Sequence, residues 1–535
     1  MDSSRNLALS VAVSLLSLVV AAGGSLRAGA APPAIAPSTM PRVAVVDERY
    51  QSYNVEMAEV IGARFWKPYP KDRDTRPPSA PTKPAGGELR IGMDPGMFEA
   101  RPPADLANPR LRTLAAALGP AFVRVSGTWA NSVYFHDSDD PAPASPPPGF
   151  QGVLTRAQWK GVVDFARAVD AKLVTSFAIS AGVRDAGGAW TPGQAGKVLA
   201  FTKSVGGDIA AAELFNEPTI PAAGGAPPGY GAAAFARDLA AFRAFVKTAA
   251  PRMVVLGPGS AGEGVALVPA SLAMLKTEDL LAASPRPVFD VFSYHFYGAV
   301  SQRCASMMGP GFGATPDAAL TDEWLSRTDR VRAFYAGLRD RFAPGAPMWL
   351  TETAEAACGG NPWATTFLDS FRYLDQLGRL AKQGVQVVMH NTLAASEYAL
   401  IDQATLTPRP NYWAALLWRR LMGPIVLDPG PASPGTHLYA HCTAGHPGGV
   451  TLMAINTSRT DTASIDLPAA ADRYMLTART LEDVHVELNG RELALGAGDQ
   501  LPSLQPTRLP KGRVELAPAS ITFLVVSGSG NPSCR

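Results

Sequence analysis

Along most of the chain, short apolar runs alternate with longer amphipathic segments. Runs such as Ala121-Phe-Val-Arg-Val-Ser and Val385 to Asn391 have the length and composition of buried strands, and segments such as Thr155 to Asp170 have the apolar spacing of helices. Counted from the strand that ends at Glu56, the pattern gives eight strands, each followed by helical or loop sequence. Eight such units over about 370 residues predict an α/β fold, a (β/α)8 TIM barrel with insertions.

Beyond Gly423 the pattern changes to short β-rich runs separated by Gly, Pro, Asn and Asp. This pattern is typical of antiparallel sheets, and it predicts a smaller C-terminal β-sandwich of about 110 residues. An early apolar strand, Arg42 to Val46, is expected to join the sandwich. The predicted organisation is therefore a signal peptide (1–30), an N-terminal strand of the sandwich (31–47), the catalytic barrel (48–423) and the sandwich (424–535).

Two of the predicted barrel strands end in a glutamate. The run Ala210-Ala-Ala-Glu-Leu-Phe-Asn-Glu-Pro breaks at Glu217, because a proline cannot donate to the ladder and disfavours helix in the residue before it. Glu352 is the charged tip of another short apolar run. By our count these are strands four and seven, and barrel enzymes carry their chemistry at the C-terminal strand ends. A lone Asn-Glu-Pro could equally end a turn, but the shared rim favours a catalytic pair.

Composition and charge narrow the function further. Hydrophobic residues make up 47% of the chain and charged residues 18%, with a formal net charge of +2. This composition is typical of a well-cored globular protein, and the charge does not indicate nucleic-acid binding. An apolar segment, Leu7 to Ala22, follows Arg5, and Ala28-Gly29-Ala30 resembles a cleavage site. We predict an export signal and a secreted or periplasmic protein, with an uncleaved membrane anchor as the alternative.

Export makes the four cysteines candidates for disulfides, and four cysteines allow three connectivities. We expect Cys442 to pair with Cys534, which would tie the C-terminal tail to its domain. We expect Cys304 to pair with Cys358, near the predicted catalytic pair. Buried free thiols are the alternative.

Several motifs together resemble one family of glycosidases. They are Asn108-Pro-Arg-Leu-Arg-Thr-Leu, Glu213-Leu-Phe-Asn-Glu-Pro, Met348-Trp-Leu-Thr-Glu-Thr, Gly359-Gly360, Tyr373-Leu-Asp-Gln-Leu-Gly, Val385-Gln-Val-Val-Met-His, Pro410-Asn-Tyr-Trp-Ala-Ala-Leu-Leu-Trp and Leu438-Tyr-Ala-His-Cys-Thr. In combination they resemble the heparanase family of retaining β-glucuronidases. The likeness is patchy at first and nearly continuous from strand six to the end, although Asn-Glu-Pro alone is shared by a wider clan of barrel glycosidases.

The resemblance implies a reaction with two carboxyl groups on opposite sides of a glycosidic bond. In retaining enzymes these groups stand about 5–5.5 Å apart. By resemblance Glu352 is the nucleophile, and Glu217 is the general acid of the first step and the base of the second. An ionised Glu352 should keep Glu217 protonated by like-charge repulsion until the first step is complete. The expected reaction uses no metal and no cofactor.

The resemblance also implies the residues that surround this pair. Asn216 would hydrogen-bond the sugar 2-hydroxyl, a contact that strengthens in the transition state. Tyr297 would donate to Glu352 and hold it ionised, and His295 would line the same wall. Simple packing is the alternative for His295 and Tyr297.

For a uronic acid, the resemblance implies donors to a carboxylate. These would be the backbone N–H groups of Gly359 and Gly360, which a ligand can approach closely, together with Tyr398. Cys358 departs from the family pattern just before the glycines. The resemblance further places two sugar-hydroxyl binders, Glu56 and Thr128, at the ends of strands one and two, with Asp94 as a rival to Glu56.

The expected function is cleavage of β-glucuronide linkages in glucuronic-acid-containing polysaccharides such as heparan sulfate. Segments 149–154 and 261–266 are nearly uncharged, whereas a sulfated chain would favour positive charge along the cleft, to which Arg303 could contribute. The alternatives are an exo-β-glucuronidase or related clan glycosidase acting on small glycoconjugates, and an inactive carbohydrate-binding relative. The two glutamates argue against the last. Segment 67–87 looks too short for a linker removed on maturation, so we expect a single-chain monomer whose partner is its glycan.

Overall fold

The computed structural model describes residues 34–70, 95–265, 274–308 and 311–535 of the chain. The predicted signal peptide and the rival residue Asp94 lie outside the described residues. Within the described part of the chain, no helix is long and apolar enough to cross a membrane.

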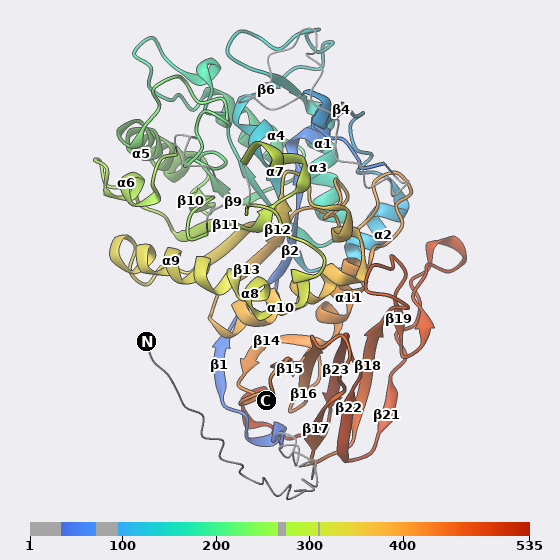
Figure 1. Ribbon diagram of the computed structural model, residues 1–535. Coiled ribbons are helices and arrows are strands. Elements are labelled where there is room, and N and C mark those ends of the chain that lie inside the picture. The colour runs from blue at the N-terminus through green and yellow to red at the C-terminus, as the bar shows by residue number, and fades with distance from the viewer. Residues whose placement is uncertain (1–33, 71–94, 266–273, 309–310) are drawn as a thin grey trace, which may run out of the picture. The chain divides into compact units, whose positions relative to one another are not determined.

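A closed barrel of eight parallel strands forms the larger part of the structure (Figure 1), as predicted. Neighbouring strands pair around the barrel in the order β10-β11-β12-β13-β2-β5-β8-β9, and β2 closes the ring by pairing with β13. Most of their residues are buried, because side chains fill the inside while helices cover the outside. The strands are β2 (Gln51–Glu56), β5 (Ala121–Ser126), β8 (Ala171–Ser176), β9 (Ile209–Glu213), β10 (Val254–Ser260), β11 (Val291–Val300), β12 (Met348–Ala357) and β13 (Val387–His390).

The helices follow the strands in the predicted alternation. Local sequence fixes several helix starts: the Asn108 side chain accepts from the N–H groups of Arg110 and Leu111 to cap α2, and Thr155 and Gln158 form a capping box at α3. The helices are α1 (Met57–Ile61), α2 (Pro109–Ala117), α3 (Arg156–Ala168), α4 (Gly193–Ser204), α5 (Ala232–Ala249), α6 (Thr277–Ala282), α7 (Gln302–Met308), α8 (Asp322–Leu325), α9 (Arg327–Phe342), α10 (Phe367–Lys382) and α11 (Pro410–Leu421).

Two predicted strand ends are wrong, and both corrections concern the glutamates. β9 ends at Glu213, so Glu217 lies in the turn that follows rather than at the strand end. Glu352 is not a strand tip but lies inside β12, which continues to Ala357. The apolar pattern hides this extension because Thr353 to Ala357 are short or polar residues that nonetheless pair with the equally long β11.

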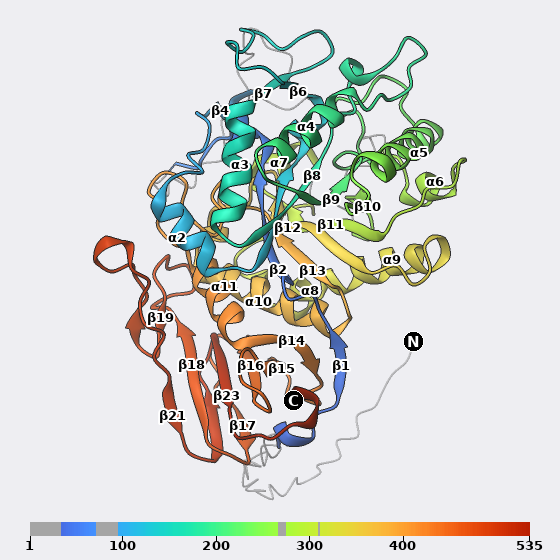
Figure 2. The ribbon, with the colours of Figure 1, turned by 180° about the vertical axis from the view of Figure 1, so that it is seen from behind.

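An antiparallel sheet follows the barrel and is arranged in the order β1-β14-β15-β16-β23-β18-β19-β20 (Figures 1 and 2). β1 pairs with β14, so the early strand belongs to this sheet. A second, two-stranded sheet of β17 and β22 covers part of one face, which makes the second layer small. The strands are β1 (Arg42–Val45), β14 (Met422–Leu427), β15 (Thr436–Thr443), β16 (Val450–Asn456), β17 (Ala463–Leu467), β18 (Ala471–Thr477), β19 (Glu487–Leu488), β20 (Arg491–Glu492), β21 (Thr507–Leu509), which also pairs with β18, β22 (Gly512–Leu516) and β23 (Ser520–Val526).

Strand alternation explains how this sheet joins the barrel. In β16, Leu452 and Ala454 belong to the core shared with β17 and β22, whereas Met453 and Ile455 belong to the same core cluster as the barrel helices. α10 packs between the large sheet and the barrel. It has almost no exposed face, and every residue from Phe367 to Gly378 is buried. Both faces of the large sheet are therefore covered.

A cluster of charged and polar side chains, which we call the seam cluster, lies where α10 meets β15. The Asp375 carboxylate lies 2.6 Å from the Tyr439 hydroxyl, 2.5 Å from His437 Nδ1 and 2.5 Å from Arg379 Nε. His437 Nε2 also lies 2.9 Å from Asp322. Burial raises the pKa of Asp375, but the His437 and Arg379 partners lower it by a larger amount. The net pKa of Asp375 is therefore below its usual range.

Both expected disulfides are present. Cys304 is bonded to Cys358, and Cys442 is bonded to Cys534. The first joins α7 to the loop after β12, and the second joins β15 to the C-terminal residues. The prediction of both pairs is therefore confirmed.

Candidate active site

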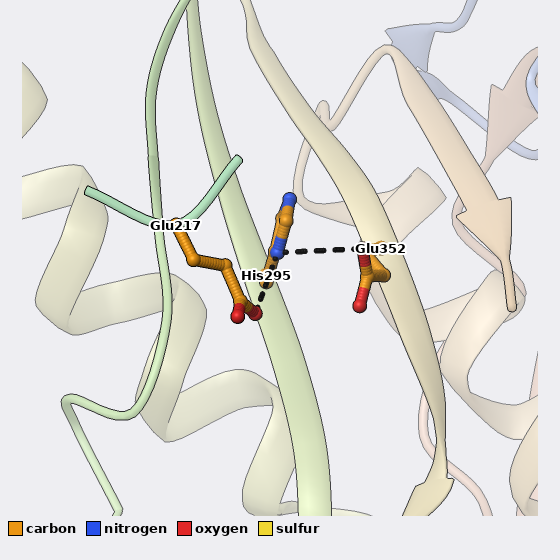
Figure 3. A group of neighbouring side chains, drawn as sticks. All are labelled: Glu217, His295 and Glu352. Atoms are coloured by element: carbon orange, nitrogen blue, oxygen red, sulfur yellow. Dashed lines mark hydrogen bonds and ion pairs between the residues drawn. The ribbon is translucent and has the colours of Figure 1, made fainter. Parts of the chain in front are cut away.

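Glu217 and Glu352 flank His295 at the C-terminal end of the barrel (Figure 3). His295 Nδ1 lies 3.0 Å from Glu217 Oε1 and 3.7 Å from Glu352 Oε2. One carboxylate oxygen of each glutamate and one ring nitrogen of His295 all lie within 4.8 Å of one another. The structure thus brings together two carboxyl groups that are far apart in sequence, at a spacing close to that of a retaining pair.

Glu217 is held in an unusual backbone conformation. Its φ is +53°, in the left-handed region that non-glycine residues rarely adopt. The preceding peptide is fixed by Asn131, whose side chain accepts from the Asn216 N–H at 2.8 Å and donates to the Asn216 carbonyl at 2.9 Å. These two hydrogen bonds hold the turn after β9 in the conformation that directs the Glu217 side chain toward His295.

Arg124, on β5, is the buried cation of the site. Its guanidinium lies 2.9 Å from Glu352 Oε2 and 2.8 Å from Glu213 Oε2, and it donates to Asn216 Oδ1 at 2.6 Å. The arginine and Glu213 side chains are each only 1% exposed. A buried guanidinium with two carboxylate partners is a stable arrangement, whereas loss of one partner would leave an uncompensated charge.

The surroundings of Glu352 favour its ionised form. Burial raises the pKa of Glu352, but His295, Arg124 and the Tyr297 hydroxyl outweigh this and lower it below the usual value. The Tyr297 hydroxyl donates to Glu352 Oε1 at 2.6 Å, and Arg124 Nη1 donates to Oε2 at 2.9 Å. Each oxygen of Glu352 therefore accepts a hydrogen bond before any substrate binds.

His295 links the two glutamates through its Nδ1 atom. On the far side of the ring, Nε2 lies 3.3 Å from Arg124 Nη2. Burial lowers the pKa of His295 and the carboxylates of Glu352 and Glu217 raise it, with a net rise. The Arg124 guanidinium opposes this rise, because it can only donate and repels a second cation, but the carboxylates outweigh it. Nδ1–H then donates to Glu217.

The predicted sugar-hydroxyl binders lie at the ends of β2 and β5. Burial and the nearby Glu352 carboxylate raise the pKa of Glu56 well above its usual range. Glu56 also caps α1. Gly127 packs directly against the Glu56 carboxyl, where a Cβ would overlap Oε2, and half-buried Thr128 follows it.

The glycine pair adopts the conformation that only glycine reaches easily, with φ of +80° at Gly359 and +78° at Gly360. Gly360 packs against Tyr398, which is 2% exposed. Asn391 Nδ2 lies 3.3 Å from the Tyr398 hydroxyl and donates at 3.0 Å to the Tyr297 hydroxyl, so one amide connects Tyr398 to the donor of Glu352. The predicted carboxylate site therefore adjoins Glu352 through Tyr297.

Arg303 does not have the role that the sequence suggested. Its side chain is 6% exposed and forms an ion pair of 2.6 Å with Glu397. It also donates to the carbonyl oxygens of Lys67, Cys358 and Gly360. With its charge paired and both terminal nitrogens engaged by protein acceptors, Arg303 is not a free cation for a sulfate group of a substrate.

A family model for glycosyl hydrolase family 79, N-terminal domain, matches residues 103–378 of this chain. The chain belongs to glycosyl hydrolase family 79. It is a glycoside hydrolase, and the resemblance stated from the sequence motifs is confirmed.

Curated family 79 relatives cover different shares of the chain. Heparanase-like protein 1 of Arabidopsis thaliana is 26% identical over 499 residues, which are 80% of this chain and 86% of that protein. Baicalin-beta-D-glucuronidase of Scutellaria baicalensis is 29% identical, over 45% of this chain and 46% of that protein. The match to the second relative thus spans less than half of its length.

A solved structure shares the fold of this family 79 protein. It is a 4-O-alpha-L-rhamnosyl-beta-D-glucuronidase from Fusarium oxysporum, which aligns with a TM-score of 0.61 over 92% of this chain and 99% of that chain. Its sequence identity is 14%, so the comparison supports the barrel and the sheet together but not the chemistry.

The three donor atoms of Glu217, His295 and Glu352 lie close enough together to surround a metal ion. One feature of the family 79 site disfavours a metal ion. The Arg124 guanidinium lies 2.9 Å from Glu352, so a second cation would be repelled. The arrangement suits proton transfer between side chains better than metal binding.

Three members of the site were missed by the sequence analysis: Arg124, Glu213 and Asn391. Arg124 had a signal, since it is the one charge inside the apolar run of a predicted buried strand. Glu213 had the same signal in its own run, but the neighbouring Asn-Glu-Pro drew attention away from it. Asn391 had none, because the asparagine directly follows an ordinary strand and matters through its contacts with Tyr297, Tyr398 and Glu56.

Proposed function

We propose that this family 79 enzyme is a retaining β-glucuronidase that acts on glucuronic-acid-containing glycans. The observation that carries the proposal is the close approach of Glu217 and Glu352 on either side of His295. Inverting glycosidases need about 6.5–9.5 Å between the carboxyl groups to admit a water, whereas retaining ones need about 5–5.5 Å. The short spacing supports a double displacement.

In the first step, a Glu352 oxygen attacks the anomeric carbon while the glycosidic C–O bond breaks. Glu217 gives its proton to the leaving oxygen, and a glycosyl ester on Glu352 results. In the second step Glu217 takes a proton from water, the water oxygen attacks the same carbon, and the ester bond breaks to restore Glu352. The two donors on Glu352 support its role as the ionised nucleophile.

His295 orients Glu217 in this scheme. Its Nδ1–H donates to Oε1 of Glu217, which leaves Oε2 to carry the transferable proton. Asn216, whose Oδ1 is occupied by Arg124, can direct its amide N–H toward the sugar 2-hydroxyl. Tyr297 and Arg124 keep Glu352 ready for attack because they remain bonded to it before substrate arrives.

The uronate carboxylate is proposed to bind the N–H groups of Gly359 and Gly360 together with the Tyr398 hydroxyl. Among the described residues, no protein acceptor takes either glycine N–H. Glu56 and Thr128 would bind hydroxyl groups of the same sugar. A carboxylate bound by backbone dipoles needs no cationic side chain.

The experiment follows the anomeric form of the first product released from an aryl β-glucuronide, by proton NMR. Retention, seen as the β anomer, is expected; the α anomer would contradict the double displacement. Glu352→Gln and Glu217→Gln should each lower kcat/KM by roughly 10³-fold or more while leaving the thermal midpoint nearly unchanged. Glu278→Gln, half-exposed on α6, is the matched control and should keep full activity.

Small glucuronides are the second candidate substrate class, and the pairing of Arg303 with Glu397 favours them. That pairing removes a cation that a sulfated polymer would need beside the proposed carboxylate site. Product analysis on heparan sulfate and on an aryl glucuronide separates the two classes. Oligosaccharides from heparan sulfate indicate internal cleavage, and turnover of the aryl compound alone indicates release of single terminal sugars.

We also propose that the enzyme is exported and acts as a monomer. The two disulfides support an oxidising compartment, since such bonds are rare where thiols are kept reduced. Identification of the mature N-terminus of secreted protein tests the export, and sedimentation tests the oligomeric state.

A further inference from the structure

The loop that carries the glycine pair is fixed by Arg303, whose guanidinium makes four contacts on one side of it. Nη1 donates to the carbonyl oxygens of Cys358 at 3.2 Å and Gly360 at 3.0 Å. Nη2 donates to the Lys67 carbonyl at 2.7 Å and to the Glu397 carboxylate at 2.6 Å. These contacts join three segments that are distant in sequence around a single buried cation.

Tyr69 and Glu397 complete the same arrangement. The Tyr69 ring lies under the Arg303 guanidinium, 3.7 Å from its central carbon, and the Tyr69 N–H donates to Glu397 Oε1 at 3.1 Å. The Glu397 N–H donates to the Gly359 carbonyl at 3.1 Å. We call Arg303, Glu397 and Tyr69 the loop anchor.

The loop anchor determines where the glycine N–H groups point. In a trans peptide, the carbonyl of one residue and the N–H of the next point in opposite directions. The loop anchor takes the carbonyl of Cys358, so the Gly359 N–H points away from it. It also takes the carbonyl of Gly359, so the Gly360 N–H points away as well. Each glycine N–H therefore points away from the group that holds the carbonyl before it, which is Arg303 for Gly359 and the Glu397 N–H for Gly360.

A covalent bond reinforces this arrangement from each end. Cys304, directly after Arg303, is bonded to Cys358, directly before Gly359, and the two Cα atoms lie 6.4 Å apart. Trp66 also packs so closely against Gly359 that a Cβ there would overlap both its ring and the Arg303 guanidinium. The glycine pair thus has little room to rotate its peptide planes.

We infer that Arg303 and Glu397 are positioning residues that set the preference of this enzyme for a carboxylate over a hydroxymethyl group on the sugar. The inference rests on the proposed function, because the glycine N–H groups are taken as the carboxylate donors. Arg303 contacts no substrate in this account. It acts only by holding the carbonyl side of the Cys358–Gly359 peptide, while the Glu397 N–H holds that of the Gly359–Gly360 peptide.

The test compares an aryl β-glucuronide with the aryl β-glucoside that carries a hydroxymethyl group in place of the carboxylate. Arg303→Met should lower kcat/KM for the glucuronide by roughly tenfold or more, mainly through KM, and leave the glucoside rate within about twofold. The ratio of the two values therefore falls. Arg184→Met is the matched control, since Arg184 is also 6% exposed and ion-paired with a buried carboxylate, Asp238, outside the site. It should reduce the thermal midpoint without changing the ratio.

Two further variants keep the inference testable if Arg303→Met fails to fold. Glu397→Gln removes the charge partner of Arg303 and should also lower the ratio, and Arg303→Lys should lower it less. A ratio within twofold of wild type in the folded variants would overturn the inference alone. A wild-type enzyme with no preference for the glucuronide would instead overturn the proposed function.

Discussion

The C-terminal end of the barrel and the seam cluster bury the same kinds of side chain. In both regions a central carboxylate is surrounded by a tyrosine, an arginine and a histidine. Each has a carboxylate that lies 2.6 Å from a tyrosine hydroxyl, an arginine within 2.9 Å of that carboxylate and a nearby histidine. In the seam cluster the histidine lies 2.5 Å from its carboxylate, Asp375, which is fully buried. In the barrel the histidine is 3.7 Å from Glu352 and turns instead toward Glu217, whose side chain is 18% exposed.

This difference shows why buried charge alone does not identify an active site. In the seam cluster the buried carboxylate has only protein partners, so the network joins α10 to β15 and, through Asp322, to α8. In the barrel, a second carboxylate with partial solvent access shares the histidine. The distinguishing features are that second acid and its position at the C-terminal strand ends.

The largest effect should come from replacing the arginine of each region with methionine. Arg124→Met should lower kcat/KM by roughly 10²–10³-fold, because a preorganised donor to the nucleophile is lost. It should also destabilise the fold by about 3–5 kcal/mol, since Glu213 is left buried without its cation. Arg379→Met should lower the thermal midpoint with kcat/KM unchanged at lower temperature. Equal losses of activity in the two variants would erase the distinction between the regions.

The two tyrosines give a smaller and closer comparison. Tyr297→Phe should lower kcat by about tenfold, since Glu352 loses one of its two donors. Tyr439→Phe should cost about 1.5–3 kcal/mol of unfolding free energy, because Asp375 loses a comparable hydrogen bond, without affecting turnover. Steady-state kinetics and denaturant unfolding of both variants measure the two effects separately.

The pH profile sharpens the role assigned to Glu352. Protonation of Glu352 removes the nucleophile, so kcat/KM should fall as the pH falls through its pKa. That pKa is lowered, which places the acid limb of the wild-type profile below the ordinary glutamate value of 4.5. In Tyr297→Phe the limb should move to higher pH. An acid limb that stays in place in this variant would argue that another group controls it.

The smallest effect concerns stability at the seam cluster. Burial and the Arg379 cation lower the pKa of His437, whereas the Asp375 and Asp322 carboxylates raise it. The carboxylates outweigh the other two, so the net pKa is above 6.5. A raised pKa contributes stability that is present below 6.5 and is lost as the pH rises through the folded value. The contribution of Asp375, whose pKa is lowered, is present above 3.8 and is lost as the pH falls.

His437→Gln should therefore lower the thermal midpoint more at pH 6 than at pH 9, by a stability difference of about 1–2 kcal/mol. His485→Gln is the control, because His485 faces Glu492 on an exposed surface where ion pairs contribute little. Thermal unfolding of both variants at the two pH values measures the effect. An equal loss at both pH values would mean that His437 acts only by packing.

Much of the fold could be predicted because it depends on periodic patterns. The eight strands, their helices and the start of α2 at Asn108 follow from local sequence, and both disulfides follow from the expected compartment. The glutamates could be placed on one rim because all parallel strands of a barrel end there. Their exact positions could not, since the strand that leads to Glu217 stops at Glu213 and β12 continues beyond Glu352.

The rest of the site depends on contacts between strands that no local pattern encodes. Arg124 binds Glu213 and Glu352, from two other strands, and Asn131 fixes the turn before Glu217 from a separate 3-10 helix. For Arg303 the sequence led to the opposite error, because it suggested a ligand contact for a residue that binds other parts of the protein. An arginine near the proposed site suggests ligand binding in a sequence, but its partner Glu397 follows 94 positions later and neutralises it.

The pairing of β1 with β14 has a practical consequence for anyone who wishes to take this enzyme apart. Because one edge of the antiparallel sheet precedes the barrel in the chain and the remainder follows it, the barrel is an insertion within the sheet. On the ribosome, β1 emerges first and must stay unpaired until the entire barrel has been made. No single cut in the polypeptide can release an intact sheet, and a barrel fragment would have to be excised at two points.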